Sequence, residues 1–340
     1  MTINIAVATS DALILGCDSI ASSAQYYVDP FKVGWEKDAS GKAIVDSDGK
    51  LTLKVADSNF EQLVTNAWGS VTKMFQITDS PSPMVAVTAG LAKLNERTIA
   101  SYGSEFLSIQ KRLPKKRKLV DCKAICGAFL KFMKKGYDTH YKASTLPPAF
   151  REGPEFLVGG FGRNDDFPSL YRVSVQNNAV VEQFVKGNFG VAWNGQSDSV
   201  ERFIRGFDSN LRSEIEGTIT KALKPHCDSV KQYVADTVNK ILDVLKQKLP
   251  PGTKIDIPEL NSIAIDWQRY RVPLDYGNLP LQEAINFASF LVNLQAAKGR
   301  FARGVATVGG YTHIGVVTKE GFKPLNEPEL AHRYTGFGDA

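Results

Sequence analysis

Short stretches dominated by apolar residues open the chain and predict β-strands. Residues 3–8 and 12–17 are rich in Ile, Val, Ala and Leu, and Ser10-Asp11 supplies a turn between them. Within residues 42–55, Asp46-Ser47-Asp48-Gly49 is typical of a hairpin turn. The same pattern predicts further strands at 72–77, 84–88, 155–161, 169–175, 180–185, 189–193, 312–318 and 322–325.

Between these strands, apolar residues recur at the spacing of a helix face. This spacing predicts helices over 91–112, 121–141, 197–249 and 281–297, and Pro250-Pro251-Gly252 ends the third region. Several strands in a row are thus followed by several helices in a row. In a doubly wound fold, single strands and single helices would alternate, so this order argues against such a fold. The order predicts an α+β fold in which two antiparallel sheets lie face to face with helices on their outer sides.

Composition narrows the class of protein. A chain of 340 residues allows one large domain or two smaller ones. With 43% hydrophobic and 23% charged residues, disordered, collagen-like and coiled-coil classes are excluded. The longest apolar stretches, such as 12–17 and 287–294, are shorter than the roughly 18 residues of a membrane helix, and the N-terminus does not resemble a secretory signal. We therefore expect a soluble, cytoplasmic protein with no membrane partner.

The net charge of +5 is concentrated in one segment. Six of the eight residues from Lys111 to Lys118 are basic, and Pro114 places them in a connector between two predicted helices. Nucleic-acid sites combine such runs with stacking aromatic residues, and none lies beside this one. The run predicts a solvated connector, and no nucleic-acid partner is expected.

Motifs for nucleotide, metal and serine-hydrolase sites are missing. The sequence contains no GxxxxGK[ST], GxGxxG, HExxH or GxSxG. The four histidines are isolated, and no second Cys or His pair accompanies Cys122 and Cys126 to complete a zinc site. The four cysteines are too scattered for a disulfide framework. We expect no metal and no cofactor.

The N-terminus carries the most specific chemistry. Removal of Met1 would expose Thr2, whose hydroxyl is a nucleophile and whose α-amine is a base with a pKa near 8. Many proteins begin Met-Thr, so the dipeptide alone favours an ordinary processed terminus. Here, however, Thr2 leads directly into a strand, and Asp18 follows the second strand sixteen residues later. A tight hairpin would bring Asp18 back beside Thr2.

The order of four elements resembles a known family. Thr2, Asp18-Ser19, Lys73 before a short apolar strand, and Ala89-Gly90 are similar to the opening of proteasome β-subunits and their bacterial relatives, which are N-terminal nucleophile hydrolases. Gly309-Gly310 before the last strands is a further similarity. The resemblance implies a four-layer αββα sandwich and a threonine-type endopeptidase.

The resemblance also implies roles for individual residues. Thr2 would be the nucleophile, Lys73 would stabilise its developing alkoxide and lower the pKa of its amine, and Asp18 would position Lys73. The backbone N–H of Gly90, at the start of the first helix, would donate into an oxyanion hole. Ser22 would bind a strand-like substrate through the main chain. An alternative for Asp18 and Lys73 is a purely structural ion pair.

Other positions depart from the family pattern. Gly195 stands where the family has a serine that assists the amine, and Ser197 is the candidate to replace it. Val305 and Val308 replace an Asp and a Ser of many active subunits. Two regions, about 25–68 and about 210–279, are predicted insertions in a single proteasome-like domain spanning 1–340.

The predicted function is hydrolysis of peptide or unfolded-protein substrates inside a homo-oligomeric ring or spiral. Because the chain contains no nucleotide-binding motif, any unfolding motor would be a separate ATPase chain. Two alternatives remain open at this stage. One is a catalytically silent proteasome-like scaffold or binding subunit, which the residues at 195, 305 and 308 favour; the other is an N-terminal nucleophile hydrolase of small amides.

Overall fold

The computed structural model describes residues 2–28, 33–38, 40–54, 60–146, 148, 151–244, 266–301 and 306–325. The chain divides into two compact units. The first comprises Met1–Ser197 with Asp275–Ala340, and the second comprises Asp198–Leu274. The first unit contains both large sheets and the candidate site.

One five-stranded sheet contains the N-terminus. Its order is β14-β1-β2-β15-β16, and every neighbouring pair is antiparallel. The turn after β1 is closed by Thr9, whose backbone N–H donates to the Ala12 carbonyl at 3.0 Å. The strands are β1 (Ile3–Ala8), β2 (Leu13–Asp18), β14 (Gly190–Gly195), β15 (Thr312–Thr318) and β16 (Gly321–Pro324). All five were predicted, with bounds that differ by no more than two residues.

The second five-stranded sheet has the order β13-β12-β11-β8-β7 and is also antiparallel. Its strands are β7 (Met74–Thr78), β8 (Met84–Gly90), β11 (Pro154–Gly160), β12 (Ser169–Ser174) and β13 (Ala179–Phe184). Alternate residues of β8 face opposite ways, as a strand requires: Val85 and Val87 join one apolar cluster, and Met84 and Ala86 join another.

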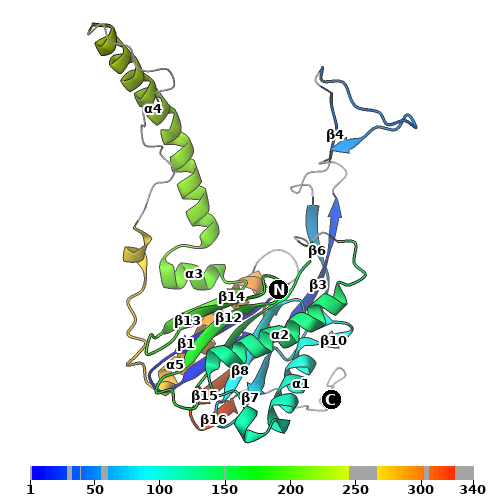
Figure 1. The fold of residues 1–340 in the computed structure, drawn as a ribbon, viewed down its shortest axis with the longest axis vertical. Helices are drawn as coiled ribbons and strands as arrows, with labels where there is room; N and C mark the ends of the chain where they lie inside the picture. Colours follow the sequence, from blue (N-terminus) through cyan, green and yellow to red (C-terminus); the bar gives the residue numbers. More distant parts are fainter. Residues whose placement is uncertain are drawn as a thin grey trace, which may run out of the picture. The chain divides into compact units, whose positions relative to one another are not determined.

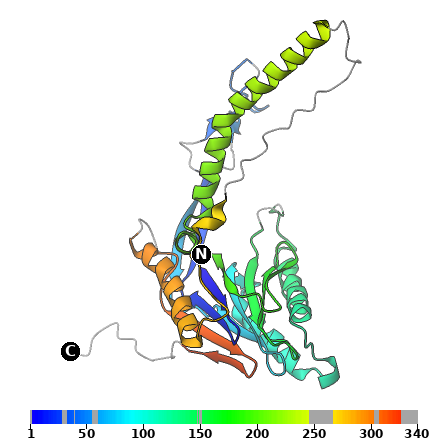
Figure 2. The same cartoon turned by 90° about the vertical axis from the view of Figure 1, so that its left-hand side faces the viewer.

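The first of these clusters lies between the two sheets. It combines Leu13 and Leu15 of β2 with Val85 and Val87 of β8 and with Leu157 of β11, all fully buried. Burial of both inner faces excludes water from a continuous apolar layer, which holds the sheets together. Figure 1 labels the strands of both sheets, and Figure 2 shows the two sheets facing each other, with helices on their outer sides.

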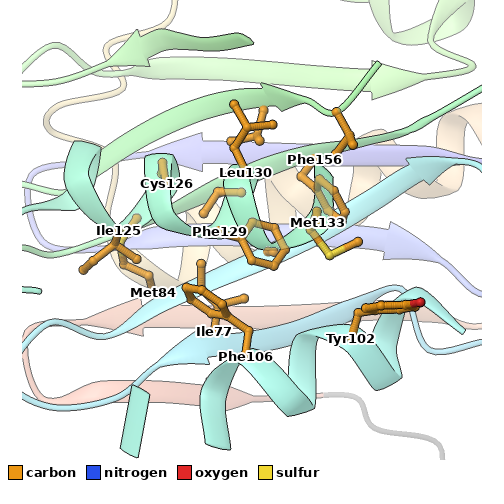
Figure 3. Close-up of a cluster of buried hydrophobic side chains, with 14 of the residues drawn as sticks. Ile77, Met84, Tyr102, Phe106, Ile125, Cys126, Phe129, Leu130, Met133 and Phe156 are labelled. Atoms are coloured by element: carbon orange, nitrogen blue, oxygen red, sulfur yellow. The ribbon is translucent and has the colours of Figure 1, made fainter. Parts of the chain in front are cut away.

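The second cluster joins the helices α1 (Ile99–Arg112) and α2 (Cys122–His140) to the outer face of the second sheet. Phe129 is at its centre, with ring centroids 5.3 Å from Phe106 of α1 and 5.0 Å from Phe156 of β11. Figure 3 shows these rings converging between the helices and the sheet. Asp121 caps α2 by accepting from the Ala124 N–H at 2.7 Å, so the helix predicted over 121–141 is confirmed.

Helix α5 (Leu281–Phe301) covers the other sheet, as predicted for 281–297. It buries Ala284, Ala288 and Leu291 against β1, β2 and β15. Gly16 of β2 permits the close approach, because a Cβ there would lie 3.1 Å from Val292 Cγ2.

The helix predicted from residue 91 begins instead at Ile99. Residues 93–98 form a two-stranded hairpin of β9 (Lys93–Leu94) and β10 (Arg97–Thr98). Asn95 and Glu96 make its turn with φ of 48° and 61°, values that a right-handed helix cannot accommodate. Thr98 then caps α1 by accepting from the Ser101 N–H at 3.2 Å.

Within the first unit, a ribbon of paired strands occupies the region predicted as the insertion 25–68. It pairs β3 (Ala21–Val28) with β6 (Phe60–Trp68), and β4 (Gly34–Trp35) with β5 (Leu53–Lys54). The predicted turn at Asp46–Gly49 is confirmed: the Asp46 carboxylate accepts from the N–H groups of Asp48 and Lys50, each at 2.9 Å.

The second unit contains α3 (Asp198–Arg205), α4 (Ser209–Val244) and a 3₁₀ turn at Trp267–Tyr270. The helical region predicted over 197–249 is therefore interrupted, because Gly206 adopts a left-handed φ of 81°. Asp208 then accepts from the Asn210 and Leu211 N–H groups, each at 2.9 Å. Predicted helical residues 245–249 lie outside the described residues. Among the helices that the structure describes, none combines the length and the apolar character needed to cross a bilayer.

Candidate active site

Three side chains predicted from the sequence meet at one end of the two sheets. Thr2 immediately precedes β1, Asp18 ends β2, and Lys73 immediately precedes β7 of the other sheet. The Thr2 Oγ1 hydroxyl donates to Asp18 Oδ1 at 2.5 Å. Lys73 Nζ donates to the same carboxylate oxygen at 2.6 Å and also to Thr2 Oγ1. The three residues are 4%, 1% and 5% exposed, so their charges and hydroxyl interact with little water between them.

Backbone donors complete the coordination of the Asp18 carboxylate. Its Oδ1 accepts from the Ile3 N–H at 3.1 Å, and its Oδ2 accepts from the Ile20 and Gly309 N–H groups at 3.2 and 3.1 Å. With the Thr2 hydroxyl and the Lys73 ammonium, five donors converge on two oxygens. Satisfied buried carboxylates of this kind have little freedom to rotate, so Asp18 sets the position of the other two side chains.

The environment of Lys73 shifts its proton affinity. Burial lowers the pKa of Lys73 below its usual value, and the adjacent Asp18 carboxylate opposes the shift. A lysine of this kind gives up its proton more readily than one on the surface. Because Nζ lies in hydrogen-bond contact with Thr2 Oγ1, it can stabilise a developing alkoxide or exchange a proton with the hydroxyl.

The end of β14 and the residue after it lie against the backbone carbonyl of Thr2. The Gln196 N–H donates to the Thr2 carbonyl at 2.6 Å. Gly195 has a φ of 82°, and a Cβ at this position would lie 2.1 Å from the Thr2 carbonyl oxygen. Glycine is therefore required here by close backbone approach, which explains the absence of a serine at 195. Ser197, the predicted substitute, is partly buried one residue beyond Gln196.

Gly90 has a different setting from the one predicted. It ends β8 and pairs with Pro154, nine residues before α1, because the β9–β10 hairpin intervenes. Its φ is 80°, and a Cβ would lie 2.6 Å from the Gly153 carbonyl oxygen. The strand of Gly90 nevertheless adjoins the site, since the Thr88 N–H donates to the Lys73 carbonyl at 3.0 Å.

Ser22 lies on the ribbon, not in the cluster of three. It belongs to β3, pairs with Ala67 of β6 and is partly exposed. The structure thus brings Thr2, Asp18 and Lys73 into direct contact, and places Gly90, Ser22 and Ser197 on neighbouring segments.

Sequence reasoning noted Gly309-Gly310 before β15 but did not predict the contacts of this segment with Asp18 and Ser19. Besides the Gly309 N–H on Asp18, the Gly309 carbonyl accepts from the Ser19 N–H at 3.1 Å, and the Tyr311 N–H donates to Ser19 Oγ at 2.8 Å. Gly310 has a φ of 76°, and a Cβ would lie 2.4 Å from Ser19 Oγ. Two adjacent glycines before a strand were a usable signal of such close approach. Val308 is 2% exposed, and Val305 lies outside the described residues.

A separate hollow lies along α2 and encloses about 580 Å³. It is lined mainly by lysines, together with Thr139, whose hydroxyl donates to the Lys135 carbonyl at 2.9 Å. Within the described ranges, no group of three or more His, Cys, Asp and Glu side chains could hold a metal ion.

Cys17, next to Asp18, allows the burial of the site to be tested through the pH dependence of stability. Burial raises the pKa of Cys17 to about 12, while an unfolded thiol titrates near 9.0. Between these values the folded chain binds one more proton than the unfolded chain, so stability must fall as pH rises, by up to about 1.4 kcal/mol per pH unit. We expect urea titrations from pH 8 to 11 to show a shallower decline for Cys17→Ala than for the native chain. Parallel declines would show that Cys17 does not retain its proton in the folded state.

Comparisons with known proteins identify no family by sequence. No family model and no curated protein matches the chain. Solved structures with similar coordinates include the Anbu complex of Pseudomonas aeruginosa in a helical assembly, at 11% identity and a TM-score of 0.46, covering 98% of this chain and 90% of that one. An Anbu Gly-1 mutant from Hyphomicrobium sp. strain MC1 has 9% identity, a TM-score of 0.45 and coverage of 98% and 88%.

A third structure is Anbu, described as an ancestral beta-subunit, from Yersinia bercovieri. It has 10% identity, a TM-score of 0.41 and coverage of 96% and 88%.

Proposed function

We propose that this protein is a threonine-type amide hydrolase that cleaves peptide bonds with Thr2 as its nucleophile. One observation carries the proposal: the Thr2 hydroxyl lies between the Lys73 ammonium and the Asp18 carboxylate, in contact with both and shielded from water. A hydroxyl held in this way by a buried ion pair is positioned to act as a nucleophile once a base accepts its proton.

The reaction requires that Met1 be removed, because only then is the α-amine of Thr2 free. That amine takes the hydroxyl proton while Lys73 stabilises the alkoxide, and Oγ1 attacks the substrate carbonyl carbon. The tetrahedral oxyanion would be stabilised by the Gly90 N–H. The C–N bond then breaks, the leaving amine takes the proton, and an ester to Thr2 forms. Water hydrolyses this ester and regenerates the hydroxyl.

The fold that we propose is the four-layer αββα sandwich of N-terminal nucleophile hydrolases. Its support is the packing of α1 and α2 on one sheet, of α5 on the other, and of a shared apolar cluster between the sheets. The ribbon that includes β3 and β6, and the second unit, would be insertions into a single proteasome-like domain. We extend the proposal to a homo-oligomeric ring or spiral acting on peptides or unfolded proteins, with any ATPase as a separate chain.

One observation favours a second candidate, a catalytically silent scaffold of the same fold. Val308 directly precedes the Gly309 N–H that contacts Asp18, and it is buried and apolar where the family resemblance implies a serine. Gly195 cannot hold a serine either, because of the Thr2 carbonyl. A silent subunit would keep the three buried side chains as a structural cluster. Hydrolysis of small amides, but not peptides, would indicate the third candidate, an N-terminal nucleophile hydrolase of small amides.

Intact mass measured before and after treatment with a peptide epoxyketone tests the proposal. This reagent bridges the amine and the hydroxyl of an N-terminal threonine, so we expect loss of the methionine mass and a gain of one adduct. Protein unfolded before treatment is the control, because it lacks the contacts of Lys73 and Asp18 and should react far more slowly. Loss of methionine without an adduct would favour the silent scaffold, and retained Met1 would exclude Thr2 catalysis in that preparation.

A further inference from the structure

Two segments far apart in the sequence form hydrogen bonds at the site, one with the Thr2 backbone and one with Asp18. Gln196, after β14, holds its backbone through the bond from the Gln196 N–H to the Thr2 carbonyl. The segment before β15 holds its side-chain partner, through the bond from the Gly309 N–H to Asp18 Oδ2. Neither bond by itself relates the two segments to each other.

A side-chain hydrogen bond joins these segments. Thr307 Oγ1 donates to Gln196 Oε1 at 3.0 Å, across 111 positions of sequence. Thr307 is 8% exposed, whereas Gln196 is exposed, so the bond is shielded from water on the Thr307 side only. The bonds now close a ring: from the Thr2 carbonyl through Gln196, Thr307 and the Gly309 backbone to Asp18, and from Asp18 back to the Thr2 hydroxyl.

We propose that Thr307 and Gln196 are positioning residues that fix the distance between the Thr2 backbone and the Asp18 carboxylate. This inference rests on the proposed function for its effect on catalysis, but the ring itself is independent of any reaction. Thr307 acts through Gln196 and through its own backbone connection to Gly309. A ring of this kind limits the small displacements to which nucleophile geometry is sensitive.

The ring fits the departures from the family pattern. Glycine at 195 and valine at 308 leave no hydroxyl at those positions, and Thr307 supplies one from the adjacent position in the same segment. Its bond goes to the residue immediately after Gly195.

Amide hydrogen exchange, measured residue by residue by NMR on the full chain, tests the ring without any substrate. Thr307→Val removes the hydroxyl and nearly preserves shape, whereas Thr307→Ser keeps the hydroxyl. We expect the Gln196 and Gly309 amides to exchange about tenfold faster in Thr307→Val and at nearly the native rate in Thr307→Ser. Gln196→Leu should accelerate the Gly309 amide by a similar factor, and the double variant should add little.

The rate of Thr2 modification by the epoxyketone then tests the catalytic part. We expect Thr307→Val to lower the maximal rate about five- to tenfold, with the half-saturating concentration within twofold of native, and Thr307→Ser to restore the rate. Unchanged exchange at both amides in Thr307→Val, or additive effects of the two substitutions, would overturn the ring. Faster exchange with no change in the modification rate would overturn the positioning role. Faster exchange in a protein whose native form never reacts at Thr2 would support the ring and reject the proposed function.

Discussion

Thr2→Ala is expected to abolish hydrolysis, with a loss of at least about 10³-fold in turnover, while the fold and any assembly persist. The substitution removes the only atom proposed to attack the substrate. It leaves the bond from Lys73 Nζ to Asp18 Oδ1 at 2.6 Å, so neither buried charge loses its partner. The loss of activity should therefore occur without the destabilisation that accompanies an unpaired buried charge.

Peptide hydrolysis, adduct formation by the epoxyketone and size-exclusion chromatography measure these effects. Thr2→Ser is the matched control, since it keeps the hydroxyl beside Lys73 and Asp18 and should retain measurable turnover. Unchanged hydrolysis in Thr2→Ala would reject the mechanism. Loss of both activity and assembly would indicate that the hydroxyl is mainly structural.

Asp18→Asn is expected to have the largest effect on stability. Both carboxylate oxygens accept, Oδ1 from three donors and Oδ2 from two backbone N–H groups. An asparagine has a single acceptor oxygen, so its NH₂ group would face donors whichever way the amide turns. Lys73 would also lose its counter-charge while 5% exposed. Together these changes should lower the free energy of unfolding by about 3–5 kcal/mol and remove hydrolysis.

Urea unfolding of the purified variant measures this loss. Asp166→Asn is the control, because Asp166 also pairs with a lysine, Lys319, at 3.1 Å, but its side chain is 85% exposed. We expect almost no change in that variant, since exposed ion pairs contribute little. An Asp18→Asn protein as stable as the control would show that the buried pair is not a structural requirement, and the proposed positions of Thr2 and Lys73 would lose their main support.

Local patterns were sufficient for most of the fold. Short apolar runs bounded by turn residues located the strands of both large sheets, because a strand packed on both faces is apolar throughout, and every residue of β1 and β2 is buried. The position of Asp18 relative to Thr2 followed from a single tight turn, since Thr9 and Ala12 close the hairpin without any distant contact. The helix start at residue 99 was missed because Asn95 and Glu96 adopt positive φ in a turn, and their residue types do not require it.

The contact between Thr2, Asp18 and Lys73 depends both on a local hairpin and on the packing of the two sheets. The hairpin of β1 and β2 brings Thr2 to Asp18. Lys73, however, immediately precedes β7 of the other sheet, so it reaches them only when the apolar faces of the two sheets pack together. Sequence order suggested this meeting through the family resemblance. The packing of Val85, Val87 and Leu157 against Leu13 and Leu15 supplies its physical cause.

The remaining features of the site depend on contacts that no local pattern contains. Gly195 is glycine because the Thr2 carbonyl lies where its Cβ would be, and Asp18 is held by Gly309, 291 positions away. The bond from Thr307 to Gln196 likewise forms only after β14 and β15 take their places on either side of the hairpin of β1 and β2. Chain periodicity reports which face of an element is buried. It does not report which distant backbone atom will lie against that face, because sheet assembly makes that choice.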